Sequence, residues 1–419
     1  MNVMVIGGGG REHAIVKKLR ENRQIDELYV LPGNGGMARE AVCVPIGATD
    51  LPAIAAFARE KAIDYAVVTP DDPLVLGAVD LLEGQGVPCF GPNKAAAILE
   101  GSKAFAKDFM ARHHIPTAAY HTFSDPAAAL EYVKDCPLPT VIKADGLALG
   151  KGVVIAETRE DATAAVRAAM CEGKFGHSGE TVVIEEFLTG PEVSVLAFTD
   201  GKTLVPMVSS MDHKRALDGD KGLNTGGMGT VAPNPYYTAA VADRCMAEIF
   251  LPTIRGMAAE GRPFKGCLYF GLMLTEKGPK VIEYNCRFGD PETQVVLALL
   301  ESDLFTVMQA VTEERLSEAE VRFADGAAAC VILASQGYPL AYEKGFEISM
   351  TEAVRPHLLF AGAKEKDGKL YTSGGRVLGV VARGKDLREA LALAYGRAEQ
   401  VSFTNEFYRR DIGKRALEA

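Results

Sequence analysis

The chain has 419 residues, a formal net charge of −10 and 48% hydrophobic residues. This length predicts two to four domains, and the acidic balance argues against binding of nucleic acid or an anionic membrane over the whole surface. The eight cysteines include no C-x-x-C pair and are expected to be reduced. Because no apolar run is long enough to span a membrane and no signal segment is visible, we expect a cytoplasmic protein.

The N-terminal region shows the alternation of strands and helices that is typical of a doubly wound domain. A strand over 3–6, a glycine turn, a helix over 11–19 and a strand over 27–31 form a βαβ unit. The turn lacks the third glycine of a dinucleotide fingerprint, and the second strand does not end in an acid, which disfavours a nicotinamide oxidoreductase. The turn is either a phosphate site, with Arg11 adding charge, or a plain tight turn. Helices over 51–61 and 74–85 and strands over 65–69 and 87–90 complete a domain that closes near residue 100.

The next region changes to strands and turns. Ser102 is expected to cap a helix that ends at Arg112, with Lys103 and Lys107 on one side as ordinary solvated lysines. A strand over 140–143 contains Lys143, and a glycine-rich loop with Lys151 leads into a second strand over 153–155. Such a loop can fold over a polyphosphate, and a plain hairpin is the alternative.

A strand over 181–184 runs into Glu185-Glu186-Phe187-Leu188, and Glu192 follows after a turn. These acids are unremarkable on a surface, whereas in a nucleotide pocket they would lie beside the adenine and the ribose.

A strand near residue 281 carries the most informative polar pattern. Glu283 and Asn285 are two residues apart and therefore point to the same face of the strand. A carboxylate and an amide oxygen so placed suit Mg²⁺, and Arg287 suits a carboxylate or a phosphate; a polar solvent face is the alternative. Asp290-Pro291-Glu292 predicts a helix start, with Asp290 as N-cap and Pro291 at the first helical position.

A third region begins at residue 325. We expect strands over 328–334 and 377–382 and a helix over 387–401. Gly374-Gly375-Arg376 is interpreted as a turn before a strand, and Arg409-Arg410-Asp411 as a solvated charge run, with a substrate role as the alternative for both.

Together these motifs resemble known enzymes. Lys143, Gly150-Lys151-Gly152, Glu185 to Leu188, Glu192 and Glu283-x-Asn285-x-Arg287 resemble the ATP-grasp signature in its usual order. The whole chain resembles the glycinamide ribonucleotide synthetase (phosphoribosylamine–glycine ligase) family, through the segments Gly8-Gly9-Gly10-Arg11-Glu12-His13-Ala14, Pro32-Gly33-Asn34, Asp212-His213-Lys214-Arg215, Asn224-Thr225-Gly226-Gly227-Met228-Gly229, Arg287-Phe288-Gly289-Asp290-Pro291-Glu292 and Gly374-Gly375-Arg376-Val377. The chain departs from the family pattern at Asp71, where glutamate is usual, and at Leu149, where a smaller residue is usual.

The resemblance implies an α/β fold: a Rossmann-like N-terminal domain with a doubly wound parallel sheet (1–101), a two-lobed ATP-grasp module (102–324, mobile lid lobe about 116–192) and a small α+β C-terminal domain (325–419). It also implies ATP-dependent ligation of glycine to 5-phosphoribosylamine through glycyl phosphate, giving glycinamide ribonucleotide, ADP and phosphate in purine biosynthesis. The alternatives are another ATP-grasp carboxylate–amine ligase and a nucleotide-binding module without turnover. We expect a monomer that binds neither nucleic acid nor membrane.

The resemblance further implies which residues form the site. Mg²⁺ or Mn²⁺ would be held by Glu283 and Asn285 in a carboxylate-poor site, because residues 269–273 offer no acid. The catalytic residues would be Arg287, Lys151 and Lys143. ATP would be bound by Lys103, Lys143, Gly150, Lys151, Gly152, Glu185, Glu186, Phe187, Leu188 and Glu192. The other substrates would be bound by Gly8, Gly9, Gly10, Arg11, Gly33, Asn34, Asp212, Lys214, Arg287 and Pro291.

Overall fold

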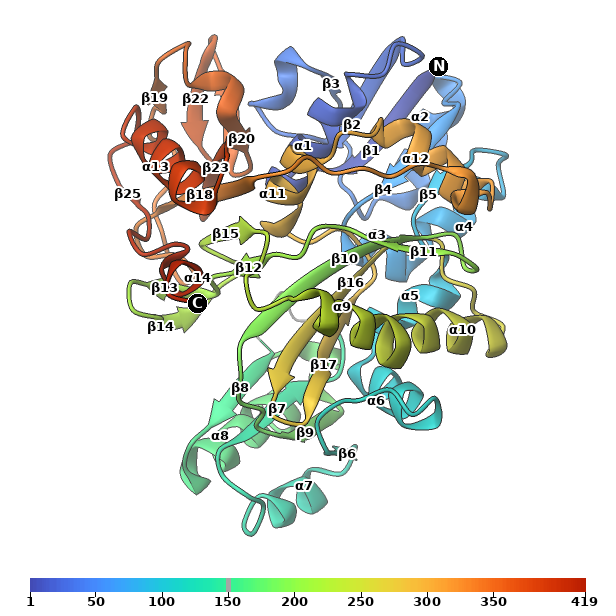
Figure 1. Ribbon diagram of the computed structural model, residues 1–419, viewed down its shortest axis with the longest axis vertical. Helices are drawn as coiled ribbons and strands as arrows, with labels where there is room; N and C mark the ends of the chain where they lie inside the picture. The colour runs from blue at the N-terminus through green and yellow to red at the C-terminus, as the bar shows by residue number, and fades with distance from the viewer. Residues whose placement is uncertain (148–151) are drawn as a thin grey trace.

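The computed structural model describes residues 1–147 and 152–419 and is organised around four sheets of four or more strands (Figure 1). In the view of Figure 1 the N-terminal and C-terminal sheets lie at the top, a central sheet crosses the middle, and a fourth sheet, which we call the lower sheet (β6 to β9), lies at the bottom. None of the helices in the described part of the chain is long and apolar enough to cross a membrane.

The N-terminal sheet is parallel, with strand order β3-β2-β1-β4-β5. Parallel neighbours need crossover connections. The helices expected from the sequence supply those after β1, β3 and β4, whereas a short 3-10 helix, Met37–Arg39, lies between β2 and β3. The helix expected over 74–85 is divided at Gly77, whose φ of +95° favours glycine. The elements are β1 (Asn2–Gly7), α1 (Gly10–Leu19), β2 (Glu27–Pro32), β3 (Val42–Cys43), α2 (Leu51–Glu60), β4 (Tyr65–Val68), α3 (Asp71–Leu76), α4 (Ala78–Glu83), β5 (Cys89–Phe90) and α5 (Lys94–Gly101).

The central and lower sheets are antiparallel, with strand orders β11-β10-β16-β17 and β6-β9-β7-β8. Ser102 caps α6 as predicted, because its hydroxyl accepts a hydrogen bond from the Phe105 N–H. The elements are α6 (Lys103–Arg112), β6 (Tyr120–Phe123), α7 (Pro126–Tyr132), β7 (Thr140–Ala144), β8 (Val153–Ala156), α8 (Arg159–Met170), β9 (Val182–Glu186), β10 (Glu192–Thr199), β11 (Leu204–Pro206), α9 (Ala239–Cys245), α10 (Leu251–Ala259), β16 (Gly266–Thr275) and β17 (Gly278–Asn285).

The C-terminal sheet has the order β12-β15-β18-β23-β20, and β25 also pairs with β18. Strand β15 pairs antiparallel with β18, so this sheet spans the boundary expected at residues 324 and 325. The elements are β12 (Met211–Asp212), β13 (Arg215–Leu217), β14 (Lys221–Asn224), β15 (Gly229–Ala232), β18 (Ala327–Ser335), β19 (Ser349–Met350), β20 (Leu358–Phe360), β21 (Ala363–Lys366), β22 (Lys369–Thr372), β23 (Arg376–Gly384), α13 (Leu387–Ala398), β24 (Val401–Ser402), β25 (Glu406–Phe407) and α14 (Lys414–Leu417).

Two helices follow β17: α11 (Glu292–Leu299), which packs against α1 and against β18 and β23, and α12 (Leu304–Thr312), which packs against α1 and β5. One buried apolar cluster contains residues of β1, α1, α11, α12 and β18, among them Val5, Val295, Phe305 and Cys330. Since burial of apolar surface stabilises each contact in proportion to its area, this shared core holds the N-terminal and C-terminal halves together. The ends of β1 and β17 and the start of β23 consequently meet near the start of α11, where Arg11 donates to Phe288 O and Arg376 pairs with Asp290.

Candidate active site

The two predicted metal ligands lie at the end of β17, opposite Gly271 and Tyr269 of β16. Neither neighbour is an acid, as the sequence indicated. Lys214 Nζ lies 3.3 Å from Glu283 Oε1, and this charge is the main reason why the pKa of Glu283 falls to about 2. Glu283 is therefore an ionised carboxylate at neutral pH.

A buried cluster of two lysines and one acid lies on the lower sheet and α6. Glu185 Oε1 is 3.0 Å from Lys143 Nζ, and its Oε2 is 2.9 Å from Lys107 Nζ. Lys107 is 2% exposed, and burial lowers its pKa to about 8. The interpretation of Lys107 as a solvated lysine was wrong: α6 turns this face toward β9, and the Glu185 carboxylate lies there.

A further lysine, Lys103, enters from the first turn of α6. Its Nζ donates to the Gly146 carbonyl at 2.9 Å, and burial lowers its pKa while the Glu283 charge opposes that shift. Lys103, Lys143 and Lys214 all act on Glu283 electrostatically. Three cations therefore lie close enough to Glu283 to lower its pKa, which is an arrangement suited to a polyanion.

The segment predicted to lie beside adenine continues from β9. Phe187 and Leu188 are half-buried, whereas the Glu186 side chain is 48% exposed and accepts from the Ala119 N–H at 3.2 Å. Glu192 begins β10 with an exposed side chain, 3.9 Å from Lys214 Nζ. Gly152 is buried and its carbonyl accepts from the Ala144 N–H, while the predictions for Gly150 and Lys151 lie outside the described residues.

Arg287 is held by an acid that the sequence analysis missed. Glu100, at the end of α5, lies 3.1 Å from Arg287 Nη2 and accepts from Asn285 Nδ2 at 3.0 Å and from the Cys286 N–H at 2.6 Å. Burial raises the pKa of Glu100, and the positive charge of Arg287 opposes that shift. Because donors of Asn285, Cys286 and Arg287 all face its two oxygens, the Glu100 carboxyl group acts as a hydrogen-bond acceptor. No local motif marks Glu100, so no sequence signal could have identified it.

A pair of carboxyl groups, Asp212 and Glu292, lies beside Lys214. Burial raises the pKa of both groups, and the charge of Glu292 raises that of Asp212 further. Glu292 is 4% exposed, and the sequence analysis gave it only a place in the first turn of a helix. The raised pKa makes the Asp212 carboxylate a stronger base than an ordinary exposed aspartate.

The glycine loop at the start of α1 packs tightly against the loop after β2. A Cβ on Gly8 would lie 2.5 Å from the Gly33 carbonyl oxygen, and Gly33 has a φ of +68°. Asn34 Nδ2 donates to Gly8 O at 2.9 Å and to Phe360 O at 2.8 Å. The Asn34 amide therefore holds the loop.

Within this loop the Gly9 N–H donates to Glu12 Oε2 at 2.6 Å. Arg11 Nε lies 2.6 Å from Glu12 Oε1, and Arg11 Nη1 donates to Phe288 O at 3.0 Å. The predicted phosphate loop and the segment after β17 are thereby joined at Phe288.

Two further predictions about charged residues were wrong. Asp290 does not cap α11: the helix starts at Glu292 with Pro291 as N-cap, and the Asp290 carboxylate binds Arg376 Nη2 at 3.1 Å and Gln294 Nε2 at 2.8 Å. Arg376, the first residue of β23, also donates to Gly226 O at 2.7 Å. At the neighbouring Gly227 an added Cβ would lie 2.4 Å from Pro291 Cδ. The ring of Pro291 therefore packs closely against Gly227.

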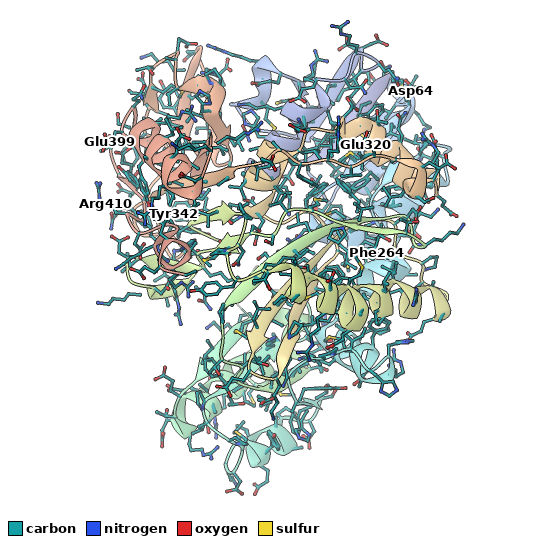
Figure 2. The ribbon with its side chains drawn as sticks, in the orientation of Figure 1. Asp64, Phe264, Glu320, Tyr342, Glu399 and Arg410 are labelled. Atoms are coloured by element: carbon teal, nitrogen blue, oxygen red, sulfur yellow. The ribbon has the colours of Figure 1, made fainter. Side chains whose placement is uncertain are left out.

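The second error concerns the C-terminal charge run. Arg409 is 2% exposed and pairs with Asp220 at 2.9 Å and Asp411 at 2.7 Å, so it is not solvated. Its neighbour Arg410 does lie at the surface (Figure 2).

Comparisons with known proteins agree along the whole chain. Models of the phosphoribosylglycinamide synthetase N domain, ATP-grasp (A) domain and C domain match residues 1–100, 101–293 and 328–415. A phosphoribosylamine–glycine ligase of Vibrio vulnificus is 48% identical over 423 residues, which cover 100% of this chain and 99% of that protein. One from Agrobacterium fabrum is 49% identical over 419 residues, with 100% and 99% coverage.

This chain belongs to the phosphoribosylglycinamide synthetase family.

Solved structures extend the comparison. The crystal structure of a phosphoribosylamine–glycine ligase from Thermotoga maritima matches with a TM-score of 0.86 and 37% identity, covering 98% of this chain and 100% of that one. A biotin carboxylase domain of Hydrogenobacter thermophilus 2-oxoglutarate carboxylase matches with a TM-score of 0.74 at 15% identity, covering 97% of this chain and 91% of that one, which shows a shared fold.

The two predicted metal donors of this chain fit a hard divalent cation. Glu283 is ionised, and Asn285 uses its Nδ2 on Glu100, which leaves the amide oxygen as the atom available to a metal. Within the described residues, no group of three or more His, Cys, Asp or Glu side chains could hold a metal ion. A cation here would therefore rely on oxygen atoms of the substrate for its remaining ligands.

Proposed function

We propose that this chain joins glycine to 5-phosphoribosylamine at the expense of ATP, giving glycinamide ribonucleotide, ADP and phosphate. The observation that carries the proposal is the convergence of ionised Glu283, Asn285, Arg287 and the lysines Lys103 and Lys143, in a chain of this family. The proposal rests on the chemistry of that set and on the names of the relatives.

The reaction needs activation of the carboxylate of glycine, because a carboxylate is anionic and lacks a leaving group. In the first step an oxygen of this carboxylate attacks the γ-phosphorus of ATP and the bond to the β-phosphate oxygen breaks, which yields glycyl phosphate and ADP. Phosphoryl transfer depends on positioning and charge neutralisation. Mg²⁺ or Mn²⁺, when held by Glu283 and Asn285, would neutralise charge on the phosphate oxygens.

The chain supplies the remaining positive charge. Lys143 and Lys103 would contact the phosphates, together with Lys151 and the loop around Gly150 and Gly152. Arg287 would bind the carboxylate of glycine and then the acyl phosphate, since its Nε is buried without a hydrogen-bond partner among the described residues. An anionic oxygen would satisfy this N–H, whereas Nη2 faces Glu100 at 3.1 Å and Nη1 donates to Phe288 O at 3.3 Å.

The nucleotide base would lie against the segment from Glu185 to Leu188, with Glu186 and Phe187 at its edge. Because Glu185 already pairs with Lys107 and Lys143, its side chain would orient the lysines while the backbone of the segment reads the adenine. Glu192, exposed at the start of β10, would accept hydrogen bonds from the ribose hydroxyls.

The second step joins the two substrates. The amine nitrogen of phosphoribosylamine attacks the carbonyl carbon of glycyl phosphate, the bond to the phosphate oxygen breaks, and the amine loses a proton. Asp212 is proposed as the acceptor of that proton, because burial and Glu292 raise its pKa. Lys214 would hold the departing phosphate. The phosphate of phosphoribosylamine would bind at Gly8 to Arg11 and near Gly33, Asn34 and Pro291, at the N-terminus of α1.

Phosphate release from Mg·ATP tests the proposal. We expect release that requires both glycine and phosphoribosylamine, the latter generated from ribose 5-phosphate and ammonia. Release that ignores glycine would keep the ATP-grasp chemistry and assign the chain to another carboxylate–amine ligase. The absence of release under all conditions would favour a nucleotide-binding module.

A further inference from the structure

A cavity lies between the N-terminal and C-terminal halves, away from the residues assigned above to substrates. Its volume is about 310 Å³, at the lower end of the range of small-molecule sites. It lies at the C-terminal end of α1, next to α11 and the last residues of β23, and Figure 1 shows these elements where the blue and the orange-red parts of the chain meet. The lining residues are Ala14, Lys17, Lys18, Gln294, Leu297, Ala298, Pro356, His357, Leu359, Val381, Ala382, Arg383 and Arg397.

The charge of this cavity is unbalanced. Its lining contains two lysines, two arginines and a histidine, and no acid. Lys17 Nζ donates to Pro356 O at 2.9 Å and Leu358 O at 2.8 Å, and Arg397 Nη1 donates to Val381 O at 3.0 Å. Of these cations, only Lys18 pairs with a carboxylate among the described residues, that of Glu21 at 2.7 Å. The side chain of Arg383 is exposed. An anion would therefore be attracted here.

The remaining lining is apolar, apart from one unsatisfied acceptor. Leu297, Leu359 and Val381 are buried and form apolar walls. Gln294 is 2% exposed, and its Oε1 is buried without a hydrogen-bond partner among the described residues. An unmade hydrogen bond of a buried amide is costly, so a ligand that donates a hydrogen bond to Gln294 would be stabilised.

We propose that this cavity binds a small organic phosphate whose compact apolar ring carries a hydrogen-bond donor. The phosphate would lie among Lys17, Arg383 and Arg397, the ring against the apolar walls, and the donor on Gln294 Oε1. Three independent features support this assignment: the cations without carboxylate partners, the apolar walls and the amide oxygen of Gln294, which has no hydrogen-bond partner among the described residues. The site does not depend on the ligase reaction.

The cavity is separate from the candidate active site, although one residue connects them. Lys17 lies seven residues after Gly10, which is about 10 Å along the helix from the glycine loop. Gln294 lines the cavity, its Oε1 has no hydrogen-bond partner among the described residues, and its Nε2 donates to Asp290, the partner of Arg376. A ligand in the cavity would thus contact the same amide that holds Asp290.

The test is isothermal titration of the full-length protein with 4-aminophenyl phosphate. We expect saturable binding that weakens roughly tenfold in Arg383→Gln, because one charge-assisted contact is lost. Arg388→Gln is the matched control: Arg388 lies on α13, is exposed and lies outside the lining. Ala298→Phe fills the cavity and should abolish binding. Phenyl phosphate, which lacks the amino group, should bind more weakly, and inorganic phosphate or aniline more weakly still.

A second set of titrations separates this cavity from the ATP site. Lys103→Met should weaken the binding of Mg·ADP and leave that of 4-aminophenyl phosphate unchanged. Four results would overturn the proposal. The first two are no saturable binding of 4-aminophenyl phosphate, and equal weakening of its binding in Arg383→Gln and Arg388→Gln. The other two are equal affinity for inorganic phosphate, which would mean general anion attraction only, and loss of 4-aminophenyl phosphate binding in Lys103→Met. None of these results bears on whether the ligase proposal is correct.

Discussion

Replacing Glu100 with glutamine is expected to weaken both the fold and the catalysis. Glu100 is 6% exposed, and its two oxygens meet donors of Asn285, Cys286 and Arg287 at 3.0, 2.6 and 3.1 Å. Glutamine has the same size, but it offers one acceptor oxygen and one donor group. It therefore leaves at least one donor unsatisfied and removes the charge that faces Arg287.

The size of the effect follows from the burial of this group. Removing one partner of a buried ion pair costs about 3–5 kcal/mol. The Arg287 side chain is 18% exposed, so some water reaches it, and we expect the lower end, about 3 kcal/mol of unfolding free energy. Because Asn285 and Arg287 both lose a contact with the Glu100 carboxylate, we expect their side chains to shift by about 1 Å. A shift of this size should lower kcat/KM about 100-fold.

Two measurements check this prediction. The chain has no tryptophan, so urea unfolding is followed by far-ultraviolet circular dichroism, and turnover by phosphate release. Glu27→Gln, at an exposed position of β2, is the matched control and should change neither quantity. If the Glu100→Gln protein does not fold, Glu100→Asp, which keeps the charge on a shorter side chain, should show the same two losses in milder form. A Glu100→Gln protein with the wild-type unfolding midpoint and wild-type kcat/KM would refute the assignment of Glu100 as the support of Arg287.

Three further changes test other parts of the site. Glu283→Gln should lower ATP-coupled turnover by about 10²–10³-fold with an unchanged circular dichroism spectrum; near-normal turnover would exclude Glu283 as a metal ligand. Arg287→Lys keeps the charge but loses the planar fork, so we expect a loss of about 100-fold in glycine-dependent kcat/KM, and wild-type kinetics would contradict its role. Burial lowers the pKa of His213 from 6.5 to about 4, so the native state binds fewer protons than the unfolded state between these values. The unfolding free energy should therefore fall by about 3 kcal/mol as pH drops from 6.5 to 4, and His213→Gln should remove that part of the slope in urea titrations at each pH.

Features that depend on near neighbours in the chain were predictable. The βαβ opening, the cap at Ser102 and the strand that carries Glu283 and Asn285 all follow from periodicity and short-range hydrogen bonding. The string from Arg287 to Glu292, together with the glycine-rich segments elsewhere in the chain, was sufficient to indicate the family by resemblance.

Features that depend on distant partners were not predictable. Lys107 was expected in solvent because its helix pattern cannot show that Glu185, 78 positions later, lies on its buried side. Arg409 was misinterpreted for the same reason, since its partner Asp220 is 189 positions away. Glu100 has no motif at all, and its role arises because α5 ends where β17 ends.

The helix start at Asp290 shows where local and long-range forces compete. An aspartate before proline is a good N-cap by itself, with a contribution of about 1 kcal/mol. In the folded chain Arg376 binds that carboxylate at 3.1 Å, and a charge-assisted contact of this kind is worth about 1.5–3 kcal/mol. The pattern of residues therefore determined the helices and strands and the kinds of side chain available to the site. The pairing of charges was determined by which elements the shared core brings together, because Coulomb attraction depends on distance in space and not on distance along the chain.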